Sequence, residues 1–103
     1  MNKLLIQFLL SAIFSGWYLM LPPKGGYLDF RVDAPISQWD QIWAGDTAKE
    51  CQDQGEKNVA FNKRVEASPT LSPGAKKLAD IEVVRSMYAL CIASDDPRLG
   101  SRK

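Results

Sequence analysis

The sequence predicts a mainly α fold: a two-helix hairpin with an N-terminal extended arm, closed by one disulfide. Three observations predict it. A helix-capping sequence starts at Thr47, and an apolar pattern with helical spacing follows Pro73. The chain also has two cysteines, Cys51 and Cys91, whose positions correspond to neighbouring ends of such a hairpin. With 103 residues, the chain has room for one small domain.

Residues 1–16 have the pattern of a secretory signal peptide. Lys3 supplies the positive charge at the start, and Leu4–Phe14 form an apolar stretch of eleven residues. Ser15 is a small residue at the expected cleavage position, so the mature protein is predicted to begin near Gly16. The segment predicts export to the periplasm or the extracellular space.

The alternative is that the same segment is an uncleaved membrane anchor that reaches residue 21. Apolar residues resume at Trp17, so that Leu4–Leu21 gives eighteen residues, close to the length of a membrane-spanning helix. Both interpretations place the rest of the chain outside the cytoplasm. The membrane is a partner only if the segment is retained.

Residues 17–33 are predicted to form the extended arm. Two prolines and two glycines between residues 22 and 26 end any preceding helix. Leu28, Phe30 and Val32 then alternate with other residues, which is typical of a short extended segment. A single strand has no pairing partner, so this segment is expected to pack on the helices.

Residues 34–103 are predicted to be a small helical domain, which opens with a pair of tryptophans. Trp39 and Trp43 are four residues apart and would share one face of a short helix. We expect them to be large anchors of the core. The alternative is an exposed aromatic platform for a ligand.

The first long helix is predicted from a capping box. Thr47 and Glu50 have the spacing in which a hydroxyl and a carboxylate each bind a free backbone amide. The helix is expected to run to about Ala67. Its inner face comprises Ala48, Cys51, Gly55, Val59 and Val65.

The second helix is predicted after a loop over residues 68–74, with Pro73 suited to a first helical position. It is expected to extend from about Ala75 to Cys91. One stripe of this helix comprises Leu78, Ile81, Arg85, Tyr88 and Ile92. Arg85 lies inside the apolar stripe, so its head group is expected to extend to solvent.

The two cysteines are predicted to form a structural disulfide. An even number of cysteines behind an export signal is typical of an oxidising compartment. Cys51 near the start of one helix and Cys91 at the end of the other would meet in a hairpin. The alternative is two buried free thiols.

Composition excludes several functional classes. The chain has no histidine, which removes the commonest general base and metal ligand. Beyond Lys3, twelve basic residues balance twelve acidic ones, so no basic face for nucleic acid is expected. We therefore predict no catalytic, cofactor-binding or metal-binding residue, and a chain that is not an enzyme.

The most suggestive acidic feature is the pair Asp95 and Asp96. With Ser94, these side chains offer oxygen ligands that calcium accepts, but the regular spacing of a calcium loop is absent. The preferred interpretation is an aspartate cap and a turn before Pro97, with Asp96 paired to Arg98.

Two segments of the chain, one following the predicted signal and one near the C-terminus, resemble motifs of other proteins. Gly16–Pro23 reads GWYLMLPP, and Cys91–Leu99 reads CIASDDPRL. In these segments, and in Ala34–Trp39 and the Asp46–Cys51 helix start, the chain resembles short uncharacterised exported bacterial proteins with a WYLM-PP start and a C-x-A-x-DDPRL ending. The resemblance implies export and the disulfide, and it implies no activity.

The sequence therefore predicts a non-enzymatic periplasmic or envelope protein that binds another protein. The partner itself is not predicted. The alternative is a single-span, membrane-anchored subunit of a larger complex.

Overall fold

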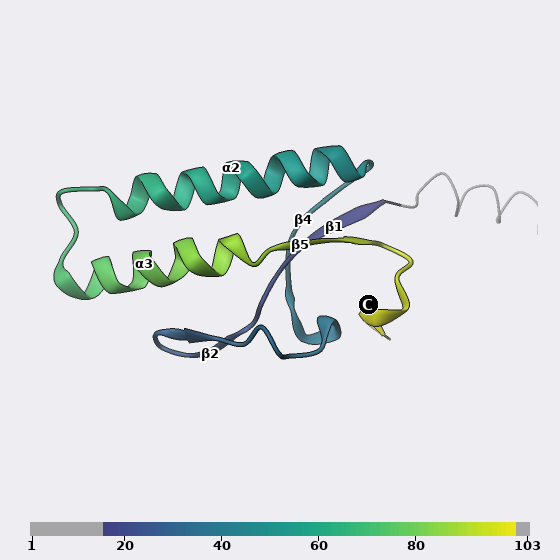
Figure 1. The fold of residues 1–103 in the computed structure, drawn as a ribbon, viewed down its shortest axis with the longest axis horizontal. Coiled ribbons are helices and arrows are strands. Elements are labelled where there is room, and N and C mark those ends of the chain that lie inside the picture. Colours follow the sequence, from purple (N-terminus) through teal and green to yellow (C-terminus); the bar gives the residue numbers. More distant parts are fainter. Residues whose placement is uncertain (1–15, 101–103) are drawn as a thin grey trace, which may run out of the picture.

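A three-stranded antiparallel sheet of order β4-β1-β5 is the centre of the fold (Figure 1). It is seen in a computed structural model that describes residues 16–100. The sheet strands are β1 (Trp17–Leu21), β4 (Asp40–Gly45) and β5 (Leu90–Ala93). Strands β2 (Lys24–Gly26) and β3 (Asp29–Phe30) form a separate two-stranded hairpin. The helices are α2 (Ala48–Glu66) and α3 (Pro73–Met87), with short 3₁₀ turns η1 (Ile36–Gln38) and η2 (Pro97–Leu99).

Strand β1 is the central strand because its side chains are apolar on both faces. Leu19, Met20 and Leu21 are consecutive and all buried, as expected for a strand covered on both sides. The two prolines that follow lack a backbone donor, so the strand ends there. Residues 17–20 are thus paired on both edges and Leu21 on one, and a membrane helix that continued through Leu21 would have to give up this pairing.

Different elements cover the two faces of the sheet. Leu19 pairs with Cys91, and α2 packs above this face. On the opposite face Met20 and Ile92 join Trp39 and Leu99 in a buried cluster. The turns η1 and η2 contact each other and close this second face. The core therefore consists of two small clusters, one on each face of the sheet.

The predicted helix that begins at Thr47 is confirmed. Helix α2 runs from Ala48 to Glu66, with Thr47 as its N-cap and Ala67 as its C-cap. Helix α3 also begins as predicted, with Pro73 at its first position and the Ser72 hydroxyl accepting a hydrogen bond from the Ala75 amide. Local capping signals located both N-termini because they depend on a few adjacent residues.

The predicted end of the second helix at Cys91 is wrong. Helix α3 ends at Met87, in a tight last turn where the amide of Tyr88 donates to the carbonyl of Arg85. The apolar residues that follow form β5, which pairs with β1. Residues 90–92 fit a helical stripe and a buried strand equally well, and the pairing with β1 decides between them.

The prediction of a mainly α, two-helix hairpin is therefore wrong, although α2 and α3 do pack side by side (Figure 1). The segment 17–33 is not one extended arm, since it contains β1, which belongs to the sheet, and the β2–β3 hairpin. Strand β1 pairs with β4 and β5. Part of β4 was predicted as a short helix, and the residues of β5 were predicted as the end of the second helix. The chain is an α+β domain.

No described helix, within residues 16–100, is long and apolar enough to cross a membrane. The predicted signal or anchor in residues 1–15 lies outside the described residues.

Candidate functional site

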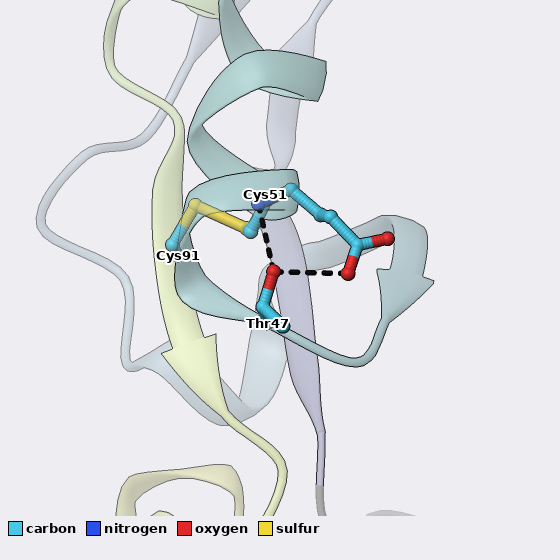
Figure 2. Close-up of a disulfide and its surroundings, with 4 residues drawn as sticks. Thr47, Cys51 and Cys91 are labelled. Atoms are coloured by element: carbon cyan, nitrogen blue, oxygen red, sulfur yellow. Dashed lines mark hydrogen bonds between the residues drawn. A yellow bond between two sulfur atoms is a disulfide. The ribbon is translucent and has the colours of Figure 1, made fainter.

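The Cys51–Cys91 disulfide joins the first turn of α2 to strand β5 (Figure 2). The two Cα atoms are 6.0 Å apart, and Cys51 is fully buried. The predicted pairing is confirmed, but Cys91 lies in a strand and not at the end of a helix. The bond therefore links a helix to the sheet beneath it, with Cys51 in the core and Cys91 partly buried.

The capping box beside the disulfide holds the start of α2 (Figure 2). The Thr47 hydroxyl accepts a hydrogen bond from the Glu50 amide at 3.1 Å and donates to the Glu50 carboxylate at 2.9 Å. The predicted hydroxyl-to-amide bond is present, while the carboxylate binds the hydroxyl in place of the Thr47 amide. Since Cys51 follows directly, the cap helps to orient the cysteine toward β5.

The Asp95–Asp96 pair is a cap and a turn. The Asp96 carboxylate accepts a hydrogen bond from the Arg98 amide at 2.8 Å and pairs with the Arg98 guanidinium at 2.9 Å. The Ser94 hydroxyl accepts from the Gly16 amide at 2.9 Å. Two of the three oxygen-bearing side chains are thus engaged within the protein. Among residues 16–100, no group of three or more histidine, cysteine or acidic side chains is placed to hold a metal.

The contact with Arg98 lowers the pKa of the Asp96 carboxyl group. Hydrogen bonds from the Arg98 side chain, and then from its amide, hold the pKa of Asp96 below its ordinary value. A folded-state pKa below the unfolded value favours folding above about pH 4, and this contribution is lost as the pH falls through the folded pKa. Replacing Arg98→Gln should therefore raise the pKa of Asp96, measured by carboxyl ¹³C NMR titration.

The matched control for this titration is Arg31→Gln, which removes an arginine paired with Asp33. It should leave the pKa of Asp96 where it is. An Asp96 pKa that does not move in the Arg98 variant would show that the contact with Arg98 does not hold the carboxylate in solution.

The two tryptophans do not form a platform. Trp39 is 5% exposed and its indole N–H donates to the Ala34 carbonyl at 2.8 Å, so the predicted core role is confirmed for this residue. Trp43 lies in β4, half-buried, and its ring covers Gly45. The prediction that both tryptophans share one face of a helix is wrong. Trp43 lies opposite Leu19 on one face of the sheet, and Trp39 packs with Met20 on the other. A bulge in β4 between these positions shifts the side chains from one face to the other.

Arg85 is buried and hydrogen-bonded, whereas its head group was expected from the sequence to extend to solvent. Its side chain is 7% exposed and does not extend to solvent. Its Nε donates to the Pro22 carbonyl at 2.7 Å, and its Nη2 pairs with Asp40 at 2.6 Å. Arg85 thus connects α3 to the end of β1 and the start of β4. A charged residue within an apolar helical stripe is the signal that should have suggested a buried partner.

A groove of about 720 Å³ lies between α2 and the junction of α3 with β5. Leu19 and Cys91 lie at its base, and one face of α2 forms a wall. The opposite rim carries Met87 and Leu90, which are 64% and 41% exposed. The groove therefore begins at the disulfide and offers apolar side chains to solvent.

Gly55 lines this groove in the middle of α2, although the packing does not require a glycine. A Cβ atom built there would lie 3.5 Å from Leu19 Cδ1, an ordinary van der Waals distance. Glycine within a helix costs about 0.5–1 kcal/mol relative to alanine. We expect Gly55→Ala to raise the free energy of unfolding by about that amount in urea denaturation. A lower stability would mean that the backbone at this position is closer to Leu19 than described.

A second apolar surface lies where the β2–β3 hairpin meets α3. We call it the aromatic patch. It is defined by Phe30 and Tyr88, whose rings are in contact, together with the exposed apolar residues of the same two elements, Tyr27, Leu28 and Val84. The rings of Phe30 and Tyr88 are 5.8 Å apart, and Lys24 pairs with Glu82 at 3.2 Å, so the hairpin is held along α3 (Figure 1). Tyr27 is 72% exposed and Tyr88 51%. Large apolar side chains are thus exposed on two adjoining elements, as is common at an interaction surface.

The fold and these surfaces define a small, disulfide-closed α+β domain with an apolar groove and an aromatic patch. The chain matches no protein-family model, no curated protein and no solved structure.

Proposed function

We propose that this chain is a non-enzymatic exported protein, of the periplasm or the extracellular space, that binds another protein. The observation that carries the proposal is the aromatic patch. Its centre is aromatic and aliphatic, and its edge carries the ion pairs Lys24–Glu82 and Arg31–Asp33. An apolar centre with a polar rim is the usual composition of a protein-binding surface.

The charges around the patch favour a protein over other partners. The two cations at the rim, Lys24 and Arg31, are each paired with a carboxylate, so neither is free to attract nucleic acid or anionic lipid. Tyrosine side chains contribute large contact area and a polar tip, which suits them to anchoring a partner. Export is supported by the N-terminal pattern and by the disulfide, which persists in oxidising compartments.

Site-specific photo-crosslinking in the native cell envelope tests this proposal. A crosslinker at Tyr27, at the tip of the hairpin, should capture a defined protein. A crosslinker at Lys49, whose side chain is 82% exposed on α2, should not. Replacing Leu28→Ser should abolish the capture at position 27, since it removes an apolar contact at the surface. Equal capture at both positions, or none at Tyr27, would contradict the proposal.

The mature N-terminus separates the exported form from the anchored alternative. Gly16 exchanges hydrogen bonds with Ser94, so cleavage before Gly16 leaves the β1–β5 pairing whole. We expect the intact mass of the protein from its native envelope to lack the first fifteen residues. A full-length mass in the membrane fraction would support the anchored subunit, whose spanning helix would have to end before Trp17.

A further inference from the structure

The wall of the groove that belongs to α2 has an ordered pattern of charge. Val59 and Ala60 are at the middle of the wall. Glu56 lies three residues before Val59, and Lys63 lies three residues after Ala60. The wall is therefore apolar at its centre, acidic on one side and basic at the same distance on the other.

Neither of these two charges forms an ion pair within the described chain, although Glu56 acts electrostatically on Lys49 from a greater distance. Among residues 16–100, no ion pair within 4.0 Å is formed by Glu56 or Lys63, whereas Lys49 and Lys76 pair along their helices. Glu56 and Lys63 are two helical turns apart, about 10 Å along the axis, and so do not reach each other. Both charges can therefore form close ion pairs with a partner that presents the opposite order.

A second copy of the same chain presents that order when its α2 runs antiparallel. A twofold axis between Val59 and Ala60 places Glu56 of each copy opposite Lys63 of the other, and the apolar centres against each other. A parallel arrangement would place like charges together, which is unfavourable. We propose that this groove is the interface of a twofold symmetric homodimer.

The opposite rim of the groove supplies side chains that fit this arrangement. Met87 is 64% exposed at the rim, and its unbranched thioether chain adapts to irregular apolar spaces. In an isologous dimer, Met87 of each copy faces the groove of the other, whose volume of about 720 Å³ exceeds that of a side chain. The inference does not rest on the proposed function, because the groove and the aromatic patch share no residue.

Charge reversal tests the interface. The whole chain is expressed with its own N-terminal segment, and the oxidised protein is analysed by sedimentation equilibrium. We expect a reversible monomer–dimer equilibrium. Glu56→Lys and Lys63→Glu should each weaken dimerisation by at least about tenfold, since each creates two like-charge contacts. The variant with both replacements should restore it, because the charges are complementary again.

Mixing the two single variants provides the sharpest measurement. Glu56→Lys carries two lysines on its wall and Lys63→Glu carries two glutamates, so a one-to-one mixture should form heterodimers while each variant alone is monomeric. Lys57→Glu is the matched control, because residue 57 is adjacent in sequence but does not line the groove. It should dimerise as the wild type does. Circular dichroism establishes that every variant is folded.

Three results would overturn the inference. They are a single monomeric mass at all concentrations, a dimer that none of the groove variants weakens, and single variants that fail to associate when mixed. Met87→Ser gives a further measurement that does not alter charge, and it too should weaken the dimer.

Discussion

Removal of the Cys51–Cys91 disulfide is expected to lower the free energy of unfolding by about 4 kcal/mol. The two residues are separated by 40 positions, so the bond excludes many conformations of the unfolded chain. A domain of this size has a total stability of only a few kcal/mol, and the reduced protein is expected to be largely unfolded at 37 °C. Thermal unfolding followed by circular dichroism, with and without reductant, measures the loss.

The double replacement Cys51→Ala with Cys91→Ala serves as the control for effects of the reductant. It should reproduce the lowered melting temperature, and added reductant should then change nothing. Thiol titration of the denatured wild type, without reductant, should find no free cysteine. Equal melting temperatures for oxidised and reduced protein would show that the bond is not structural.

Replacing Arg85→Met should lower the free energy of unfolding by about 3 kcal/mol. The volume and the apolar stem are roughly kept, but the Pro22 carbonyl loses its donor and Asp40 loses its partner. An unsatisfied buried carbonyl is costly because neither water nor another donor replaces the lost bond. Urea denaturation measures the change.

An exposed arginine provides the comparison for Arg85. Arg98 also pairs with an aspartate at 2.9 Å, but its side chain is 59% exposed. Arg98→Met should leave the urea midpoint nearly unchanged, because solvent screens an exposed pair. If both variants lose equal stability, or neither does, then the burial of Arg85 is not what makes it important.

Signals carried by adjacent residues predicted local structure well. The starts of α2 and α3 followed from Thr47 with Glu50 and from Pro73, because caps are satisfied by the chain itself. The Asp96 turn was predicted for the same reason. These features need no knowledge of distant parts of the chain.

The sheet was not predicted because its signals are non-local. Strand β1 is buried on both faces, so it lacks the alternation that identifies an exposed strand, and it continues the apolar N-terminal run. Its neighbours lie about twenty and seventy residues further along the chain. Neither β4 nor β5 is recognisable as a partner until β1 is known to be a strand.

The candidate surfaces were missed for a related reason. The aromatic patch combines the β2–β3 hairpin with α3, and the groove combines α2 with the start of β5. Each surface exists only once the fold brings its elements together. The disulfide was predicted correctly although the hairpin used to argue for it is wrong, because two cysteines behind an export pattern already indicate a disulfide and allow only one pairing.

The position of β1 at the start of the described fold determines the order in which the domain assembles. Its partner β5 comes almost at the end of the chain, so the central strand acquires its second neighbour only when residue 93 is available. A chain that crosses a membrane with its N-terminus first therefore cannot complete its sheet, or close its disulfide, during transit. We expect the sheet to form only after residue 93 has emerged, and folding to be slow relative to that of a helical hairpin of this size, because the decisive contacts join residues about seventy positions apart.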